Sequence, residues 1–421
     1  MTSSARPLRI ALVTETYPPE INGVATTLAQ LVSGLRREGH HIELTRPRQS
    51  GVDPGPRFTA SGRWFARGSD TGPLSDPDAA FSERLTVGMP IPRYPGLRLG
   101  LPAGMLLERG WRMRRPDVVH IATEGPLGWS ALSAARRLGL PVVSEFRTNF
   151  HAYSAHYGFG VLRKWVLAYL RRFHNGCAVT MVPTSGLVRE LQGFGFERLR
   201  VVARGVDSDR FHPVHRCSSL RIAWGAGPDT PVVIHVGRLA PEKNLDLLVS
   251  GFQRMRSVRP DVRLVVVGDG PARGWLEERL PGVVFAGRRV GHDLARHYAS
   301  ADLLMFPSLT ETFGNVTLEA MASGLAVLAF DYGAAGEVVL PGIHGWTVPF
   351  GDGEAFLQVA AESLRNLEWV RRLGSQAREV AEGLSWGEIV RTVSAMYSGV
   401  VAPSRHWRGS GFMLSRADPV R

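Results

Sequence analysis

A basic loop early in the second half of the chain has the residue types that bind phosphate. Gly237-Arg238-Leu-Ala-Pro-Glu-Lys243 follows an apolar run, precedes a helical pattern and places two cations five residues apart. An arginine can donate two parallel hydrogen bonds to phosphate oxygens, and a lysine adds a compact positive charge. A helix N-terminus adds N–H groups that point at the phosphate. The segment therefore predicts a diphosphate site, with a solvated basic turn as the alternative.

Two carboxylates on either side of a glycine turn form a second constellation. Glu311 lies in the predicted loop before Gly314, and Glu319 lies about two turns inside the helix that this glycine can open. Carboxylates accept hydrogen bonds from sugar or ribose hydroxyls, so the pair suits a hydroxyl-rich ligand. Taken alone, the same pattern also fits a helix cap followed by an exposed glutamate.

A glycine-rich turn, Val267-Gly268-Asp-Gly270-Pro-Ala-Arg-Gly274, resembles the dinucleotide fingerprint of nicotinamide-dependent oxidoreductases. That fingerprint needs an acidic residue about 20 positions later, at the end of the next strand. Here the next predicted strand runs into Arg288 and Arg289. The sequence thus argues against an NAD-dependent oxidoreductase.

These loops follow short apolar runs that alternate with helical patterns, which indicates α/β architecture with parallel sheets covered by helices. Ligands of such sheets bind beyond the carboxyl ends of the strands. A first series of predicted strands covers residues 9–13, 117–121, 141–144 and 181–183, and a second covers 232–236, 263–267, 283–285, 303–306 and 326–329.

The length of 421 residues exceeds what one core usually supports, so two domains are expected. Residues 205–231 are rich in Asp, Pro and Gly and are predicted to be the linker between them. The predicted units are an N-terminal domain over 1–205, with an irregular loop at about 50–82, and a C-terminal domain over 206–385. A C-terminal helix over 386–402 is expected to pack back on the first domain, followed by a basic tail over 403–421.

The formal charge of +12 indicates an anionic partner, such as nucleic acid, an acidic membrane surface or a phosphorylated substrate. A nucleic-acid-binding module is the rival class, but the cations are scattered and no nucleic-acid motif accompanies them. Cys177 and Cys217 lack the spacing of a metal site, and no apolar run approaches the roughly 20 residues of a membrane span. We expect a cytoplasmic protein that is either soluble or peripheral on the inner face of the cell membrane.

Gly237-Arg238…Lys243, Gly268-Asp-Gly270-Pro and Glu311…Glu319, in this order and spacing, resemble the signature of retaining glycosyltransferases of family four. The resemblance covers roughly residues 8–400 and includes the opening at Glu15–Val24 and the segment at Arg204–Pro213. It implies the glycosyltransferase-B fold, in which two Rossmann-like domains face each other across a cleft. It also implies a hexosyltransferase that needs no cofactor or bound metal and uses a nucleotide-sugar donor. GDP-mannose with a lipid or glycan acceptor is the expected pair, and a UDP-sugar is the alternative donor.

The resemblance assigns a role to each matching residue. Arg238 and Lys243 neutralise the donor diphosphate, Glu311 holds the transferred sugar together with backbone N–H groups, and Glu319 holds the ribose. The resemblance also implies that the sugar keeps its configuration because the donor phosphate itself accepts the proton of the acceptor hydroxyl. A dedicated protein base is then not required. The implied catalytic residues are Glu311, Arg238, Lys243, His151 and Arg147, and the implied donor-binding residues are Gly23, Gly237, Gly268, Gly270, Val290, Thr312, Phe313, Gly314, Asn315, Val316 and Glu319.

One position departs from the family pattern. Members often carry a His-Thr-x-Phe segment near the donor sugar, whereas this chain has Arg147-Thr-Asn-Phe-His151. Either His151 replaces the family histidine, or Arg147 contacts the donor or an anionic acceptor. An ordinary loop or core histidine is the alternative for His151.

A basic amphipathic segment over 161–173 offers a candidate membrane surface. Arg163, Lys164, Arg171 and Arg172 are expected on one half of a helix, with Leu162, Trp165, Tyr169 and Phe173 on the other. A core helix with a solvated face is the alternative to an anionic-lipid surface. The triplets Asp76-Pro-Asp78 and Asp207-Ser-Asp209 resemble a metal motif but lie in the predicted loop and linker, so no metal site is predicted.

Overall fold

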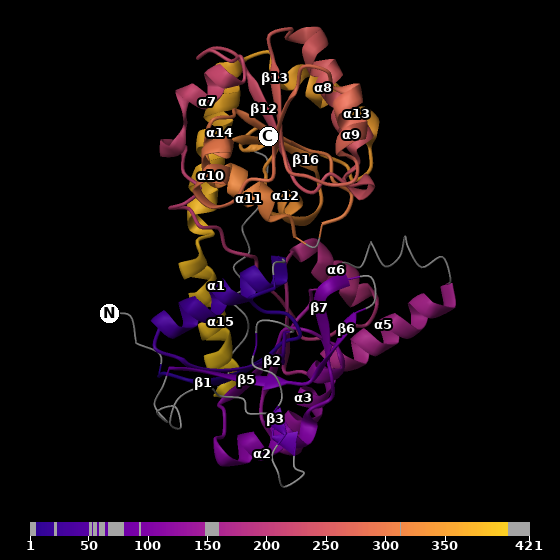
Figure 1. Ribbon diagram of the computed structural model, residues 1–421, viewed down its shortest axis with the longest axis vertical. Coiled ribbons are helices and arrows are strands. Elements are labelled where there is room, and N and C mark those ends of the chain that lie inside the picture. The colour runs from indigo at the N-terminus through magenta and orange to yellow at the C-terminus, as the bar shows by residue number, and fades with distance from the viewer. Residues whose placement is uncertain are drawn as a thin grey trace, which may run out of the picture.

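The computed structural model describes residues 6–20, 23–49, 53, 57–58, 64–65, 80–91, 94–147, 160–311 and 313–402. The chain forms two α/β halves stacked along the long axis of the molecule, each built on its own sheet (Figure 1). The predicted arrangement of two α/β halves, each built on a parallel sheet, is confirmed. In the described residues, no helix is both long and apolar enough to cross a membrane.

The N-terminal sheet has seven parallel strands in the order β11-β10-β9-β8-β1-β2-β5. Its central strands β9, β8 and β1 are buried almost throughout, as expected where helices cover both faces of a parallel sheet. The strands are β1 Arg9–Val13, β2 His41–Pro47, β5 Phe81–Thr86, β8 Val118–Ile121, β9 Val142–Glu145, β10 Val179–Val182 and β11 Leu199–Val201, and the helices are α1 Gly23–Arg37, α2 Gly104–Met113, α3 Pro126–Arg137, α5 Gly160–His174 and α6 Ser185–Gly193.

The C-terminal sheet has six parallel strands in the order β14-β13-β12-β15-β16-β17. Two apolar clusters cover its opposite faces. The strands are β12 Val232–Val236, β13 Arg263–Val267, β14 Val284–Gly287, β15 Leu303–Phe306, β16 Ala326–Phe330 and β17 Gly345–Val348, and the helices are α7 Ser218–Ala223, α8 Leu245–Val258, α9 Arg273–Arg279, α10 Gly291–Ala299, α11 Asn315–Ala322, α12 Gly333–Val338, α13 Gly353–Ser363 and α14 Leu367–Gly383.

The last helix, α15 (Trp386–Val401), runs from the C-terminal half to the N-terminal half (Figure 1). Its apolar side chains join the cluster on one face of the N-terminal sheet. It crosses α1 so closely that a Cβ on Gly34 would lie 2.3 Å from Val390 Cγ2. Two polar contacts also fix its position, from Ser394 Oγ to His40 Nε2 and from Tyr397 OH to His120 Nδ1, both 2.7 Å.

The predicted loop and linker contain more structure than expected. Within residues 50–82, β3 (Arg57–Phe58) pairs with β4 (Trp64–Phe65) and β5 begins at Phe81; most of the remaining loop, including Asp76 and Asp78, lies outside the described residues. A second hairpin joins β6 (Gly88–Ile91) and β7 (Tyr94–Gly100). Residues 205–231 contain α7 and a single 3₁₀ turn, so they are not an extended linker throughout. The basic tail over 403–421 lies outside the described residues.

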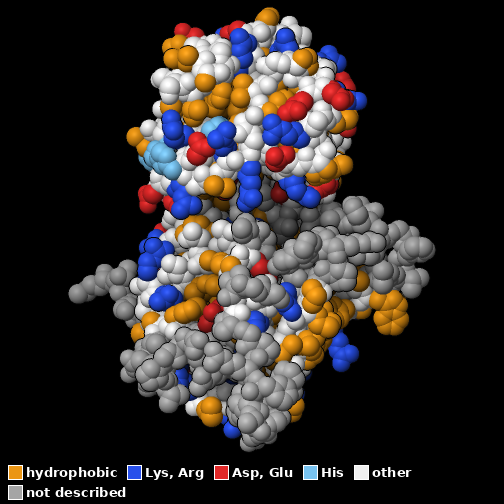
Figure 2. Space-filling view, in the orientation of Figure 1, with side chains coloured by type: hydrophobic (Ala, Val, Ile, Leu, Met, Phe, Trp, Pro, Cys, Tyr) orange, Lys and Arg blue, Asp and Glu red, His pale blue; other side chains and the backbone are white. Residues whose placement is uncertain are grey.

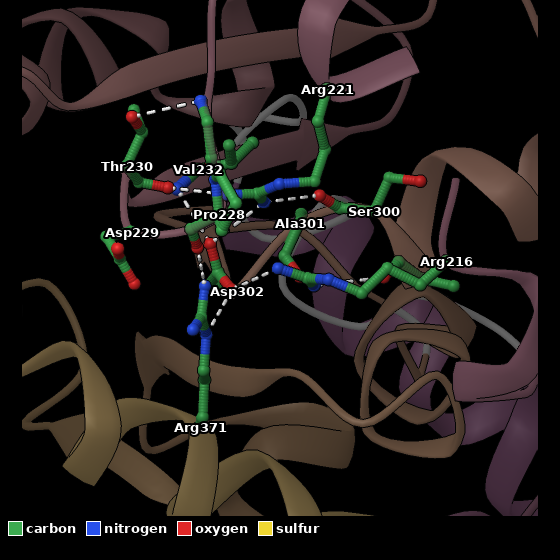
Figure 3. A network of polar contacts seen from close by, with 12 residues as sticks. Arg216, Arg221, Pro228, Asp229, Thr230, Val232, Ser300, Ala301, Asp302 and Arg371 are labelled. Carbon is green, nitrogen blue, oxygen red and sulfur yellow. Dashed lines mark hydrogen bonds and ion pairs between the residues drawn. The ribbon is translucent and has the colours of Figure 1, made fainter. Parts of the chain in front are cut away.

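A buried carboxylate anchors the segment that connects the two halves, residues 205–231, to the C-terminal sheet (Figure 3). Asp302, fully buried at the start of β15, binds the guanidinium groups of Arg216, Arg221 and Arg371 at 2.8, 3.2 and 3.0 Å. It also accepts the N–H of Val232 at 2.9 Å. Three of the cations behind the basic net charge are therefore paired within the protein.

Candidate active site

The C-terminal sheet reverses its strand order between β12 and β15, which are hydrogen-bonded neighbours. Chain connections leave in opposite directions at such a point, and the crevice beyond the carboxyl ends of the two strands binds ligands. The loop with Arg238 and Lys243 follows β12, and the loop with Glu311 follows β15. The topology thus brings together two sequence motifs that lie about 70 residues apart in the chain.

Lys243 and Glu311 are in direct contact in this crevice. Lys243 Nζ lies 2.6 Å from Glu311 Oε1 and 3.3 Å from the carbonyl oxygen of Thr310. Ser308 Oγ donates to the same Oε1 at 2.8 Å. Both charged side chains are mostly buried, with exposed fractions of 16% and 17%. A partly desolvated ion pair is held at the expected phosphate and sugar site.

Arg238 lies on the same loop but is 68% exposed and forms an ion pair with Glu242. The carbonyl oxygen of Glu242 accepts a hydrogen bond from Thr310 Oγ1 at 3.2 Å, which ties the two loops together. Arg238 therefore lies on a loop that is tied to the Glu311 loop, with its guanidinium group accessible to solvent.

Glycines are required where the loops after β12 and β13 pack together. A Cβ on Gly268 would lie 1.8 Å from the carbonyl oxygen of Gly237, and one on Gly270 would lie 2.3 Å from that of Leu239. Their φ angles of 142° and 158° also disfavour side chains. These glycines position the backbone that carries Arg238.

Helix α11 begins beside Glu311. Gly314 adopts the left-handed conformation, with φ of 96°, and Asn315 is the first helical residue. The side-chain oxygen of Asn315 is buried without a hydrogen-bond partner among the described residues. Phe313 is fully buried, and Val316 is partly buried. The helix N-terminus therefore follows the Glu311 loop directly, and its first residue has an amide oxygen that no described residue binds.

Glu319 is the fifth residue of the eight-residue helix α11, so it lies little more than one turn inside the helix rather than two. Its Oε2 accepts a hydrogen bond from Tyr298 OH at 3.0 Å. Burial raises the pKa of Glu319, although the Tyr298 hydrogen bond opposes this shift. Burial also raises the pKa of Tyr298 well above its usual value, so the hydroxyl remains a donor.

Arg147 lies at the carboxyl end of β9 in the N-terminal half and forms an ion pair with Glu145. His120 Nε2 lies 2.9 Å from the other oxygen of Glu145. Burial disfavours the charge on Glu145, but the charge of Arg147 and the contact with His120 outweigh it and lower the pKa of Glu145 to about 2. The sequence did not single out Glu145 or His120, because their mutual contact joins two different strands, β8 and β9.

Arg204 belongs to the segment that connects the two halves. Its guanidinium carbon lies 5.7 Å from the centre of the Phe313 ring, which is in the Glu311 loop. Burial and the charge of Arg147 lower the pKa of Arg204 to about 10, while Glu145 and Glu311 oppose the shift. This electrostatic coupling connects the Arg147 group of the N-terminal half to the crevice of the C-terminal half.

The remaining predicted site residues have less structural definition. His151 and Thr312 lie outside the described residues. Val290 caps α10 at its N-terminus and is 64% exposed. Gly23 is the first residue of α1, and a Cβ there would have no neighbour within 4 Å among the described atoms. Contacts with the described residues therefore do not require a glycine at position 23. Its expected role, which is to let the backbone approach a donor phosphate closely, stays a prediction.

Two facing α/β halves, with a lysine–carboxylate pair at the switch point of one of them, define the class of nucleotide-sugar-dependent glycosyltransferases. Comparison with known proteins leads to the same class. Residues 21–210 match the family described as Glycosyltransferase Family 4, and residues 230–366 match Glycosyl transferases group 1. The chain belongs to glycosyltransferase family 4.

Individual relatives extend over most of the chain. A GDP-mannose-dependent alpha-mannosyltransferase of Mycobacterium tuberculosis is 34% identical over 93% of this chain and 97% of its own length. A sulfoquinovosyl transferase of Arabidopsis thaliana is 33% identical over 70% of this chain and 59% of its own length. Among solved structures, sucrose-phosphate synthase from Thermosynechococcus elongatus superimposes with a TM-score of 0.70 at 20% identity, over 94% of this chain and 100% of that one.

Proposed function

We propose that this glycosyltransferase transfers mannose from GDP-mannose to a lipid or glycan acceptor, with retention of configuration at the sugar. The observation that carries the proposal is the contact between Lys243 Nζ and Glu311 Oε1 at the switch point of the C-terminal sheet. The similarity to GDP-mannose-dependent enzymes over almost the whole chain supports the choice of donor. A UDP-sugar is the alternative donor.

The donor diphosphate binds between Arg238 and Lys243. Figure 2 shows Lys and Arg side chains along the rim of the C-terminal half that faces the N-terminal half. Two cations stabilise the negative charge that develops on the diphosphate as the sugar leaves, and fixed charges do so without reorganisation. In this proposal they supply the neutralisation that a divalent metal supplies in other transferases, so transfer is metal-independent.

The sugar and the nucleoside bind on either side of the diphosphate. Glu311 accepts hydrogen bonds from sugar hydroxyls, and the backbone from Phe313 to Val316 donates to them. The buried amide oxygen of Asn315, which has no described protein partner, is a further acceptor for a hydroxyl. Glu319 binds the ribose hydroxyls, and the base lies near Val290.

The C-terminal half is therefore the donor side and the N-terminal half the acceptor side, divided at about residues 205–206. Gly23 lies at the N-terminus of the 15-residue helix α1, where the positive end of the helix dipole favours an anion. Arg147 lies at the carboxyl edge of the N-terminal sheet. The connecting segment with Arg204 lies between the two sides, so it can couple closure of the cleft to substrate binding.

Donor binding tests this proposal directly. Saturating GDP is expected to raise the melting temperature, because a ligand at 100 times its Kd stabilises the folded state by about 2.7 kcal/mol. UDP is expected to produce a smaller shift. GDP release from GDP-mannose, with an added lipid acceptor fraction, is expected to persist in excess EDTA.

The outcomes separate the two donor classes. A larger shift with UDP than with GDP would replace the guanine donor by a uridine donor and keep the enzyme class. Loss of turnover in EDTA, restored by Mg²⁺ or Mn²⁺, would contradict the metal-independent mechanism.

We also propose that the α5 edge of the N-terminal half binds an anionic membrane surface. Trp165 and Tyr169 on α5 are 72% and 43% exposed, so the helix is not simply a core helix with a solvated polar face. Lys164, Arg171 and Arg172 on the same helix are also exposed, and Figure 2 shows hydrophobic side chains gathered along this edge. Apolar side chains flanked by cations suit an interface with acidic lipids.

Vesicle pelleting tests the surface. The protein is expected to pellet with vesicles rich in phosphatidylglycerol, and the double variant Arg171→Glu plus Arg172→Glu is expected to remain in the supernatant because it reverses two charges. Arg254→Glu, an exposed arginine of α8 in the other half, is the matched control. A wild-type protein that does not pellet would exclude the surface.

A further inference from the structure

Arg147 has more hydrogen-bonding groups than the described protein satisfies. Its side chain is only 8% exposed, and one nitrogen, Nη2, binds Glu145. Nε and Nη1 are buried without a hydrogen-bond partner among the described residues. Buried polar groups in native proteins almost always have partners, so unsatisfied guanidinium donors require an explanation.

The charged side chains around Arg147 also carry a net positive charge. Arg147 and Arg204 are two permanent cations beside one carboxylate, that of Glu145. Glu311, the next carboxylate, is already bonded to Lys243 and Ser308. The unfavourable proximity of the two arginines contributes to the lowered pKa of Arg204, after the larger effect of burial. The group of Arg147, Arg204 and Glu145 therefore has one more cationic side chain than carboxylates.

A cavity lies at the two arginines. Arg147, Arg204 and Glu145 line it together with Trp386, with Thr27 and Leu31 of α1, and with further apolar side chains, and its volume is about 40 Å³. One water needs roughly 10–15 Å³ measured in this way. The space therefore suits a few waters or a group of the size of a carboxylate or phosphate.

We propose that Arg147 and Arg204 form a binding site for an oxyanion, a carboxylate or phosphate group carried by the substrate, beside the sugar-binding Glu311. This inference rests on the proposed function, since it places a charged substrate in the same cleft. A planar guanidinium group donates two parallel hydrogen bonds to one carboxylate or phosphate group. A histidine at position 147 could not do this. The donor diphosphate already has Arg238 and Lys243, so an acidic acceptor is the first candidate source of the group.

The experiment compares probes that differ only in charge. With GDP saturating, the affinities of methyl α-D-glucuronide and methyl α-D-glucoside are measured by ligand-observed NMR, and inorganic phosphate is added as a competitor. The wild type is expected to bind the glucuronide at least about tenfold more tightly than the glucoside. Phosphate is expected to displace it.

Variants assign this preference to the two arginines. Arg147→Met and Arg204→Met are each expected to abolish the preference, Arg147→Lys to retain part of it, and the surface control Arg254→Met to leave it unchanged. Should Arg147→Met fail to fold because Glu145 loses its partner, Arg147→Met in the Glu145→Gln background and Arg204→Met alone carry the test.

The affinity for GDP in the same variants distinguishes the sources of the oxyanion. An unchanged Kd for GDP, with loss of the glucuronide preference, places the group on the acceptor. A tenfold or larger loss of GDP affinity in both Arg147→Met and Arg204→Met places it on the donor diphosphate. No charge preference in the wild type, together with unchanged GDP affinity in both variants, overturns the proposal. A wild type that prefers the glucuronide but does not bind GDP or UDP contradicts the donor assignment instead.

Discussion

Glu311→Ala is expected to lower kcat by about 10²-fold or more while the protein remains folded, as expected for loss of a group that stabilises the transition state. Among the described residues, Lys243 and Ser308 both bond to Oε1 of Glu311, which leaves Oε2 to accept a hydrogen bond from the sugar. The transferred sugar becomes electron-deficient as the diphosphate leaves. A fixed carboxylate beside it then binds more strongly than in the ground state, which is the condition for an effect on kcat.

The measurement is GDP release from GDP-mannose under saturating donor. Glu311→Gln keeps the shape of the side chain but removes its charge, so its kcat is expected to lie between those of the wild type and the alanine variant. Glu278→Ala, whose side chain is 80% exposed on α9, is the control and is expected to retain wild-type turnover. Near-normal kcat in a correctly folded Glu311→Ala would remove this residue from the catalytic machinery.

Lys243→Ala is expected to weaken donor binding and to slow transfer, with a combined loss of about 10²-fold in kcat/KM. The lysine has two functions in the structure. Its ammonium group is the expected partner of the diphosphate, and it also holds Glu311 at 2.6 Å. Removing it leaves a mostly buried carboxylate facing the incoming diphosphate without a compensating charge. Lys243→Arg is not expected to restore activity, because a guanidinium group differs in size and geometry.

The two predictions are coupled. Residues in direct contact show non-additive effects. The loss of transition-state stabilisation in the double variant Lys243→Ala plus Glu311→Ala, calculated from kcat/KM, is therefore expected to be smaller than the sum of the losses in the two single variants. Titration with GDP gives the donor affinity separately from turnover. Unchanged affinity and rate in Lys243→Ala would exclude the lysine from the site, and strict additivity would show that the ion pair has no functional role.

The sequence was sufficient to predict the strands that carry the donor site. Strands β12, β13 and β15 occur at the predicted residues because Val, Ile, Leu, Met and Phe dominate these short runs, as expected for a parallel sheet buried on both faces. Strand β2 was missed because charged and polar residues interrupt its apolar pattern as Ile42-Glu-Leu-Thr-Arg46. Strand β17 was missed because four residues, Gly-Trp-Thr-Val, give too short a pattern.

The site was predictable only where its residues form local motifs. The loops with Lys243 and Glu311 are short segments of special composition, and the strand-order rule brings them together. The group of His120, Glu145 and Arg147 with Tyr397 depends on contacts across as many as 277 residues, which no local pattern reveals. Arg204 was visible only as part of a connecting segment, because its contact with the Phe313 ring depends on how distant parts of the chain pack against each other.

The account depends on one arrangement of the donor, and a crystal structure of the chain with GDP-mannose or an inert analogue tests it most directly. We expect the diphosphate between Arg238 and Lys243, with Arg238 released from Glu242, the sugar hydroxyls on Glu311 and the ribose on Glu319. A donor whose diphosphate lies away from both cations, or whose sugar does not contact Glu311, would contradict the account.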